Sequence, residues 1–353
     1  MKKSQKNALS KNKQSSLAKD HLLRQRADAS PEKEKLSIKV IKQMLYLNSK
    51  FVRTFNQTFE TTKTIETIRI ATVVLPVREK LIEVPNKKDR SLSQFIIKDE
   101  LFVDHLDSFL DAIKKACSLG ANFVCAGELA FPNSDKKQFQ KPIKFFEDEI
   151  KKLSQKGTYI IPGSFHNKDF FGVSPVFHNN RNISNPFPHK KANPATKVHE
   201  KLKTDPEKKL YHYTTEFGSF SIFICLDSYD AALVSKLLAY NYRGANINHH
   251  PINILFVPSL NKDVKDALDG CKMISYGAGN IVVFVDCKNY CKQGHVFALG
   301  KEMKRNEAES ENNISVFDVD FSAFQKERLK ISNEYSNMFK YVLDLEGLIT
   351  SFK

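Results

Sequence analysis

Residues 221–228 read SIFICLDS, an apolar run that ends on Cys225 with Asp227 two positions later. A short run rich in Ile and Phe is typical of a buried strand. A cysteine at the end of such a strand has two interpretations. It can pack in the core as a small hydrophobic residue, or the turn after the strand can present it as a nucleophile.

Segments with strand and helix patterns alternate around this run. Apolar runs of strand length predict strands over residues 68–77, 122–132, 158–165, 217–225, 253–259, 280–289 and 314–322. Helical patterns predict helices over residues 99–121, 141–157, 231–241 and 261–279. Residues 166–213 are irregular and rich in Asn, Pro, His and Lys, a composition typical of functional loops. The alternation predicts one α/β or α+β domain over residues 66–325.

The two ends of the chain differ from this domain. Residues 1–35 are rich in Lys, Ser, Asn and Gln, and we expect them to form a disordered basic tail. Apolar residues at helical spacing over 36–57 predict an amphipathic helix, so residues 36–65 are expected to form a helical extension. We expect residues 326–353 to form a C-terminal tail that packs on the domain or on a dimer partner.

The formal net charge of +15 is concentrated near the N-terminus, where residues 1–66 hold fifteen Lys and Arg against six Asp and Glu. A basic tail attracts nucleic acid or acidic membranes without specificity, but a solubilising role is the better interpretation. No window approaches the ~18 consecutive apolar residues of a spanning helix, and no apolar segment follows the basic start. We expect a cytoplasmic protein with no membrane partner.

The six cysteines are scattered rather than spaced as a disulfide framework, and we expect free thiols. Cys287 and Cys291 form a C-x3-C pair, but no second Cys or His pair at zinc-ligand spacing accompanies them. We therefore expect no metal.

Two further stretches contain residues that could carry chemistry. Glu128 lies among apolar neighbours in FVCAGELAF (123–131). A buried carboxylate is costly unless it is paired or used, and burial moves its pKa towards that of a general base; the alternative is a strand-end glutamate turned to solvent. The stretch HKKANPATKVHE (189–200) adds Lys190, Lys191, Lys197 and Glu200, although most lysines in this chain are expected on the surface.

The ordered motifs AGELAFP, KKANPATKVHE and FICLDSYD resemble those of the nitrilase or carbon–nitrogen hydrolase superfamily, nearest in context to its amidase-type branch. The later VPS and N-x-V-V-F-V segments agree, and the resemblance covers residues 66–325. It implies a four-layer α-β-β-α sandwich of the nitrilase type, preceded here by the basic N-terminal extension. It also implies a homodimer or higher homo-oligomer and no organic cofactor.

The resemblance also implies a reaction. Glu128 would be the general base, and Cys225 would attack an amide, a nitrile or an N-carbamoyl compound to form a thioester, which water then hydrolyses. A lysine and the backbone N–H of Leu226 would stabilise the oxyanion. Asp227 is interpreted as a turn-forming residue that fixes the cysteine.

Three lysines are candidates for the cation. Lys191 is favoured because its separation from Cys225 is nearer that of the family; Lys197, in K-V-H, is the first alternative and Lys190 the second. Glu200 is the expected second glutamate, with Glu207 as runner-up. The chain departs from the family pattern at Gly127, where a proline is usual, and at Leu226, where a tyrosine is usual.

Two other functions use the same sequence features. A catalytically silent nitrilase-like scaffold would bind nucleic acid or a protein through the basic extension. An acyltransferase would form the same thioester but pass the acyl group to an amine.

Overall fold

The computed structural model describes residues 52–55, 65–134, 136–186, 188–195, 200–205, 208–242, 251–311 and 313–331. The chain divides into two compact units, residues 1–47 and 48–353, and every described residue belongs to the second. The predicted tail over 1–35 lies outside the described residues. So do most of the predicted extension over 36–65 and the end of the chain after residue 331.

One part of the predicted helical extension is wrong. Residues Val52–Phe55 form strand β1, which pairs in parallel with β12 (Leu210–Thr215). The sequence VRTF alternates β-branched or aromatic residues with polar ones, a pattern that suits a sheet surface. The apolar residues before Val52 have helical spacing, and the predicted helix therefore includes residues 52–55. These residues form a strand because they pair with β12, which lies more than 150 residues away along the chain.

Two large sheets form the body of this unit. The seven-stranded sheet has the order β1-β12-β13-β14-β15-β16-β17. Its other strands are β13 (Gly218–Ile222), β14 (Ile252–Pro258), β15 (Ile281–Val285), β16 (His295–Ala298) and β17 (Lys301–Glu302). The six-stranded sheet has the order β10-β9-β6-β5-β2-β18. Its strands are β10 (Arg181–Asn182), β9 (Phe177–His178), β6 (Tyr159–Ile161), β5 (Phe123–Ala126), β2 (Thr67–Val73) and β18 (Ile314–Asp320).

The remaining elements cover the sheets or frame one end of them. The helices are α3 (Asp99–Ser118), α4 (Lys137–Leu153), α5 (Ala231–Tyr242) and α6 (Val264–Ala278). A hairpin joins β3 (Leu81–Pro85) to β4 (Ser93–Ile97), and a small sheet has the order β11 (His189–Lys190), β8 (Gly172–Ser174) and β7 (Phe165–His166). The short 3-10 turns are η2 (Arg78–Lys80), η3 (Ser154–Lys156) and η5 (Cys225–Tyr229).

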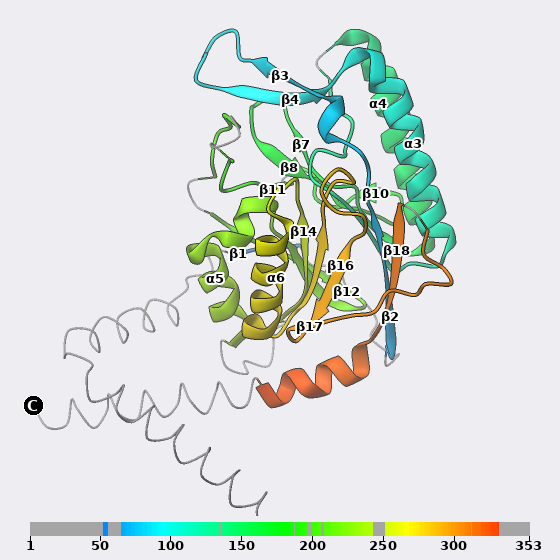
Figure 1. Ribbon diagram of the computed structural model, residues 1–353, viewed down its shortest axis with the longest axis vertical. Coiled ribbons are helices and arrows are strands. Elements are labelled where there is room, and N and C mark those ends of the chain that lie inside the picture. The colour runs from blue at the N-terminus through cyan, green and yellow to red at the C-terminus, as the bar shows by residue number, and fades with distance from the viewer. Residues whose placement is uncertain are drawn as a thin grey trace, which may run out of the picture. The chain divides into compact units, whose positions relative to one another are not determined.

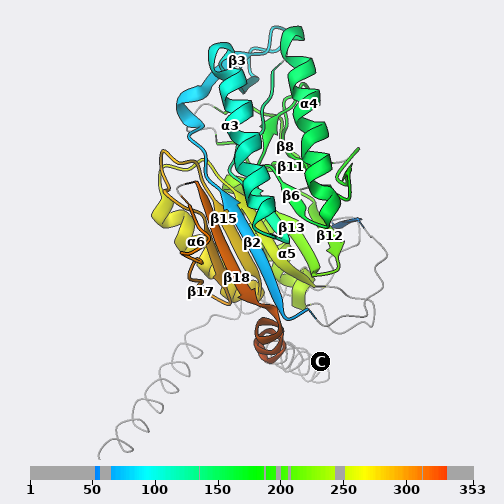
Figure 2. The same cartoon turned by 90° about the vertical axis from the view of Figure 1, so that its right-hand side faces the viewer.

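Three buried clusters separate four layers. One joins α3 and α4 to the six-stranded sheet, a second fills the space between the two sheets, and a third joins α5 and α6 to the seven-stranded sheet. Figures 1 and 2 show α3 and α4 on one outer side and α5 and α6 on the other. The predicted α-β-β-α sandwich is therefore confirmed.

The central strands are apolar on both faces because each face has a helix layer or a sheet against it. In β5, Val124 and Ala126 pack under α3 and α4, whereas Phe123 and Cys125 face the other sheet. Strands covered on both sides have continuous hydrophobic runs instead of alternation. This explains why the sequence pattern found these strands, although the run predicted over 122–132 extends beyond the end of β5 at Ala126.

Parallel pairing collects the candidate site residues at one edge of the sandwich. Strands β2, β5 and β6 run parallel, and so do β13, β14 and β15. Glu128 follows β5 and Cys225 follows β13, so the two come from different sheets. Ligand sites in such folds lie at the carboxyl ends of the strands.

The described part of the C-terminal region is a helix over residues 321–331. Phe321 and Phe324 pack into the core between the sheets, and Arg328 donates to the Ile252 carbonyl at 3.4 Å. The predicted boundary at residue 325 therefore falls inside a helix. Among the described residues, no helix is long and apolar enough to cross a membrane.

Candidate active site

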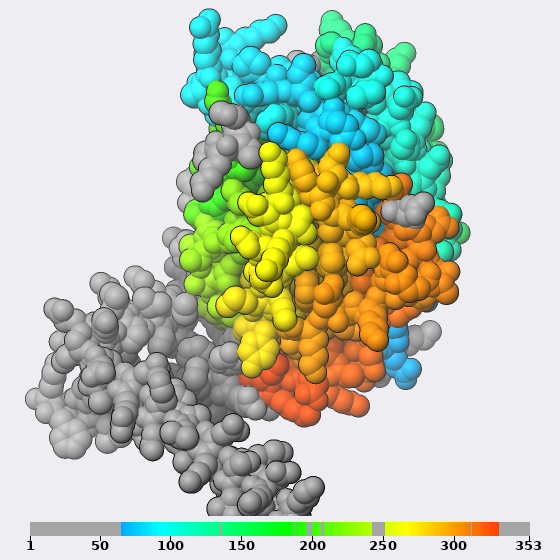
Figure 3. All heavy atoms as spheres, viewed as in Figure 1, coloured from blue at the N-terminus to red at the C-terminus, as the bar shows by residue number. Residues whose placement is uncertain are grey.

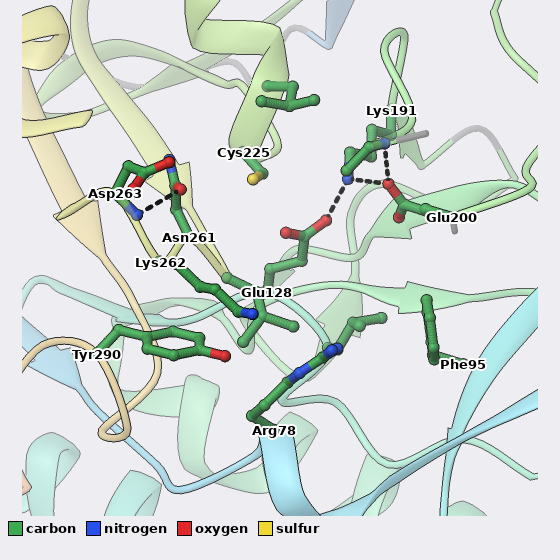
Figure 4. A pocket seen from close by; sticks show the side chains of 14 residues that line it. Arg78, Phe95, Glu128, Lys191, Glu200, Cys225, Asn261, Lys262, Asp263 and Tyr290 are labelled. Atoms are coloured by element: carbon green, nitrogen blue, oxygen red, sulfur yellow. Dashed lines mark hydrogen bonds and ion pairs between the residues drawn. The ribbon is translucent and has the colours of Figure 1, made fainter. Parts of the chain in front are cut away.

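A cavity of about 420 Å³ opens at the strand ends where Glu128 and Cys225 lie. It is lined by residues from both sheets, the hairpin and several loops: Arg78, Phe95, Glu128, Leu129, Lys191, Ala195, Glu200, Cys225, Leu226, Leu260, Asn261, Lys262, Asp263 and Tyr290. Figure 4 shows the polar members of this set around the cavity.

Cys225 opens the turn after β13 in a strained backbone conformation. Its φ is +51°, a region that residues other than glycine adopt uncommonly. The predicted strand over 217–225 ends earlier, at Ile222, so the cysteine belongs to turn η5. Ser228 Oγ donates to the Cys225 carbonyl at 2.8 Å, which holds the turn. The strain fixes the direction of a thiol that is only 4% exposed.

Glu128 sits directly beyond β5, opposite the cysteine turn. Its backbone N–H donates to the Ser259 carbonyl at 3.1 Å and thereby ties the two sheets together at the site. The side chain is 3% exposed, and burial raises the pKa of Glu128 to about 7, against a smaller opposing effect of Lys191. A carboxyl group with such a pKa exchanges protons readily near neutral pH. Burial and the charge of this carboxylate raise the pKa of Cys225, whose Sγ accepts a hydrogen bond from Ser259 Oγ at 3.6 Å.

Lys191 is held between two buried carboxylates. Its Nζ donates to Glu128 Oε1 at 2.6 Å and to Glu200 Oε2 at 2.7 Å, and the residue is 2% exposed. Burial alone would lower the pKa of Lys191, but the two carboxylates outweigh it and hold the pKa well above its usual value. The ammonium therefore stays charged, with two of its three N–H donors occupied by the glutamates (Figure 4).

The other two candidate lysines are not among the described residues that line the cavity. Lys190 points away from this pair, with its Nζ 4.1 Å from the centre of the Phe171 ring. Lys197 and Glu207 lie outside the described residues. Within the part of the chain that is described, the structure thus brings Glu128, Lys191, Glu200 and Cys225 to one cavity.

Glu200 has its orientation fixed by a histidine that sequence reasoning missed. His166 Nε2 lies 3.0 Å from Glu200 Oε1, and the backbone N–H of Phe95 donates to His166 Nδ1 at 2.9 Å. Because Nδ1 accepts, the ring proton resides on Nε2 and is donated to Glu200. Burial opposes ionisation of Glu200, but Lys191 and His166 outweigh it and lower the pKa of Glu200. A buried histidine in the irregular loop region carried no distinctive sequence signal.

Asp227 joins the cysteine turn to the lysine loop. Its Oδ2 accepts from the backbone N–H of Ile224 at 3.2 Å, within the turn. Its Oδ1 accepts from the backbone N–H groups of Ala192 and Asn193 at 3.0 and 2.9 Å, directly after Lys191. The predicted turn-forming aspartate therefore also fixes where Lys191 lies relative to Cys225.

Gly127, beside Glu128, packs against the backbone that follows two strands of the other sheet. A Cβ at this position would lie 3.3 Å from the Asp286 backbone and 3.4 Å from the Ser259 carbonyl. The buried Asp286 carboxylate in turn accepts from the backbone N–H of Asn261, at 3.2 and 3.1 Å to its two oxygens, and from that of Cys287 at 2.6 Å. Burial raises the pKa of Asp286 to about 7.

The other cysteines take no part in this cavity. All six are free thiols. Cys291 Sγ lies 3.3 Å from His295 Nε2, but the described residues contain no group of three or more His, Cys, Asp or Glu that could hold a metal ion.

Comparison with solved structures identifies the fold. Saccharomyces cerevisiae Nit3, a member of branch 10 of the nitrilase superfamily, superposes with a TM-score of 0.52 at 15% identity, over 75% of this chain and 94% of Nit3. An amidase from Nesterenkonia sp. gives 0.50 at 12% identity, over 76% of this chain and 97% of the amidase. This is the nitrilase fold.

The resemblance found in the sequence is therefore confirmed at the level of the fold. Another nitrilase-fold match is a variant of the amidase from Nesterenkonia sp. AN1 in which the acetamide moiety of fluoroacetamide is attached to the active-site cysteine. It has a TM-score of 0.50 at 13% identity and covers 79% of this chain and all of that chain. Searches with family models and against curated proteins returned no match.

Proposed function

We propose that this protein is a carbon–nitrogen hydrolase that cleaves an amide through a thioester on Cys225. The observation that carries the proposal is Lys191, a buried ammonium bonded to two buried glutamates in the same cavity as the cysteine. Isolated buried charges are costly, and this arrangement supplies a base, a fixed cation and a nucleophile together. The covalent adduct on the active-site cysteine of the Nesterenkonia sp. AN1 amidase supports a nucleophilic cysteine in this fold.

Formation of the thioester begins with proton transfer. Burial and the charge of Glu128 raise the pKa of Cys225, so the resting thiol is protonated, and the ionised Glu128 accepts its proton as Sγ attacks the amide carbon. The carbonyl π electrons move to oxygen and form a tetrahedral oxyanion. In the proposal this oxygen accepts hydrogen bonds from the third N–H of Lys191 and from the backbone N–H of Leu226.

When the tetrahedral intermediate breaks down, the proton moves from Glu128 back to the substrate. The protonated Glu128 donates to the amide nitrogen, the C–N bond breaks, and ammonia or an amine leaves a thioester on Cys225. Water then loses a proton to Glu128 and attacks the thioester carbon, and Glu128 returns the proton to the departing sulfur. A pKa of about 7 suits Glu128 for both directions.

Glu200 and His166 act in this scheme by positioning Lys191. Glu200 holds one N–H of the ammonium, and His166 and the backbone N–H of Ala195 hold Glu200. Because Lys191 cannot turn away from Glu128, its remaining donor keeps one direction. Lys197 and Lys190 are the alternative cations, and the Lys191 contacts favour Lys191 over both.

The proposal is tested with the full-length protein and a panel of amides, nitriles and N-carbamoyl compounds. We expect hydrolysis of an amide, and a fall in kcat of about 10⁴-fold or more in Cys225→Ala. Cys125→Ala is a suitable control because Cys125 is buried between the sheets away from the cavity lining. Full activity in Cys225→Ala would contradict the proposal.

Two other functions remain distinguishable by experiment. An acyltransferase would use the same thioester, and addition of an amine acceptor would then yield a new amide in place of the free acid. A silent scaffold that binds nucleic acid through the basic extension would hydrolyse none of the panel. The paired buried charges around Lys191 favour an enzyme, since a binding scaffold has no use for them.

We also propose a cytoplasmic homodimer. Six free cysteines suit a reducing compartment. Helix α6 lies at the surface in Figure 3. Its residues Met273 and Tyr276 are 76% and 61% exposed, and Tyr229 in the neighbouring turn η5 is 44% exposed. Large apolar side chains grouped on one face favour burial against a second copy.

A further inference from the structure

One hydrogen-bond donor beside Cys225 has no part in the reaction proposed above. Ser259 directly follows β14, and its Oγ donates to Cys225 Sγ at 3.6 Å. Ser259 is buried, and among the described residues its hydroxyl has no other hydrogen-bond partner. The buried hydroxyls of Ser174 and Ser275 instead donate to backbone carbonyls at 2.8 Å. The Ser259 hydroxyl is therefore directed at the sulfur of the proposed nucleophile.

The backbone around Ser259 is held by hydrogen bonds to both sheets. Its N–H donates to the carbonyl of Val285, the last residue of β15, at 2.8 Å. Its carbonyl accepts from the Glu128 N–H at 3.1 Å, and the nearby N–H of Asn261 donates to the Asp286 carboxylate. Because the backbone is fixed in this way, the hydroxyl is already oriented before the reaction begins.

The proposed reaction places negative charge on a buried sulfur at two steps. Cys225 Sγ becomes negative as its proton moves to Glu128, and again when it leaves the thioester. Burial and the charge of Glu128 raise the pKa of Cys225, so both oppose these steps. Lys191, the Leu260 backbone and the Ser259 hydroxyl lower this pKa.

Lys191 has no N–H left for the sulfur in this scheme. Two of its three donors are bonded to Glu128 and Glu200, and the third is assigned to the oxyanion. A direct bond to sulfur must therefore come from another group. A neutral thiol is a weak acceptor, whereas charge-assisted hydrogen bonds are about twice as strong as neutral ones. The Ser259 bond therefore strengthens as the sulfur becomes negative, and only such a difference speeds the chemical step.

From this geometry we infer that Ser259 is a further catalytic residue, whose hydroxyl donates a hydrogen bond to Cys225 Sγ while this sulfur is negatively charged. The inference rests on the proposed hydrolase function. It adds no covalent step, because the hydroxyl proton stays on the Ser259 oxygen throughout. The bond acts twice in each turnover, when the sulfur attacks the amide and when it leaves the thioester.

Ser259→Ala in the full-length protein tests this role, with Ser221→Ala as its matched control. Ser221 is a buried serine of β13 whose hydroxyl has no hydrogen-bond partner among the described residues. We expect kcat to fall about 10- to 100-fold in Ser259→Ala, because the lost bond is to a charged group. Ser221→Ala should remain within about threefold of wild type, and Ser259→Thr, which keeps a hydroxyl, should retain most of the activity. Wild-type kcat in Ser259→Ala would overturn the inference.

Comparison of kcat with KM separates this role from a structural one. Residues 260–263 of the same loop line the cavity, so a displaced loop would weaken substrate binding and raise KM. Loss of a bond to the reacting sulfur should instead lower kcat and leave KM within about twofold. A Ser259→Ala variant whose loss lies in KM alone would overturn the inference.

Alkylation measures the same bond without an amide substrate. Iodoacetamide reacts with the thiolate, so it should label Cys225 at least about tenfold more slowly in Ser259→Ala than in wild type. Ser221→Ala should label as wild type does. If no amide is hydrolysed yet labelling depends on Ser259 in this way, the hydrolase proposal fails while the bond to the thiolate stands. If amides are hydrolysed but neither kcat nor labelling depends on Ser259, the assignment of Ser259 fails alone.

Discussion

At the scale of single residues, the site depends on the balance between one ammonium and two carboxylates. Lys191, Glu128 and Glu200 are each less than 5% exposed, so none of the three charges is compensated by water. The ammonium allows two buried glutamates to lie close together, and they in turn keep it charged. Because removal of one member leaves the others unmatched, the trio must be considered as a unit.

Lys191→Met tests this balance, with Lys190→Met as its matched control. The Lys191 variant should lose about 10²-fold or more in kcat and about 3–5 kcal/mol in the free energy of unfolding, because two buried carboxylates lose their cation. Lys190 contacts the Phe171 ring instead, so its variant should remain within about 1 kcal/mol and within threefold in rate. Activity assays and urea unfolding measure both. Comparable losses in the two variants would argue against Lys191 as the cation.

The pKa of Glu128 predicts the acid limb of the pH profile. Burial raises this pKa to about 7, and the base is active only as a carboxylate, so kcat/KM should fall about tenfold per pH unit below 7 and level off above it. Burial raises the pKa of Asp286 to the same value. If Glu128 is the titrating group, Asp286→Asn should still show the fall in kcat/KM below pH 7. Loss of this fall in Asp286→Asn would assign the titration to Asp286. A Glu128→Gln variant should have no measurable hydrolysis at any pH.

At the scale of elements, the position of the site follows from where strands end, and this much was predictable from sequence. The run before Glu128 is apolar on both faces, whereas β13 alternates the buried serines Ser219 and Ser221 with Phe220 and Ile222. These runs located β5 and β13 to within three residues at each end except after Ala126. The short strands β7 to β11 were not predicted, because two or three residues carry no detectable period. Their pairing with one another, β8 with both β7 and β11 for example, makes them strands rather than local preference.

The long-range hydrogen bonds could likewise not be predicted from the sequence. Asp227 was predicted to form a turn with Cys225, but its bonds to Ala192 and Asn193 cross 35 and 34 residues of chain. The same holds for His166 and Glu200, separated by 34 residues. The candidate residues could be named from motifs in this case, whereas the groups that orient them required the structure.

Asp227→Ala tests the link between the cysteine turn and the lysine loop. It leaves the buried backbone N–H groups of Ile224 and Ala192 without their acceptor, each at a cost of about 1–3 kcal/mol, and also the partly buried N–H of Asn193. We expect a lower melting temperature and a fall in kcat larger than that in KM. Ser228→Ala, which removes a single bond in the same turn, should have the smaller effect. An Asp227 variant with wild-type kcat would show that the link is dispensable.

At the scale of the whole sandwich, two sheets from separate parts of the chain meet at one edge and each contributes part of the site. The sequence resemblance implied this architecture, but local patterns alone predicted only an α/β or α+β domain. The pairing of β1 with β12 shows the limit of local reasoning, since it replaced part of a predicted helix. The close packing at Gly127 shows another, because only the structure reveals that a Cβ there would lie 3.3 Å from the Asp286 backbone and 3.4 Å from the Ser259 carbonyl.

The proposed dimer makes a prediction at this scale. Met273→Lys with Tyr276→Lys on α6 should shift the protein from dimer to monomer in sedimentation velocity, because both side chains expose apolar surface on one helix. Val103→Lys with Phe145→Lys, exposed positions on α3 and α4, is the matched control and should leave the dimer intact. A wild-type protein that sediments as a monomer at micromolar concentration would contradict the proposal.

The account depends most on Cys225 as the nucleophile and Glu128 as its base, and alkylation followed by mass spectrometry tests both at once. Full-length protein treated briefly with iodoacetamide at pH 7.5 should gain one adduct, located on Cys225, in parallel with loss of amidase activity. Glu128→Gln should slow this labelling by about 10²-fold or more, while Cys125→Ala should label as wild type does. Labelling spread over several cysteines, or a Cys225 adduct that forms equally fast in Glu128→Gln, would contradict the account.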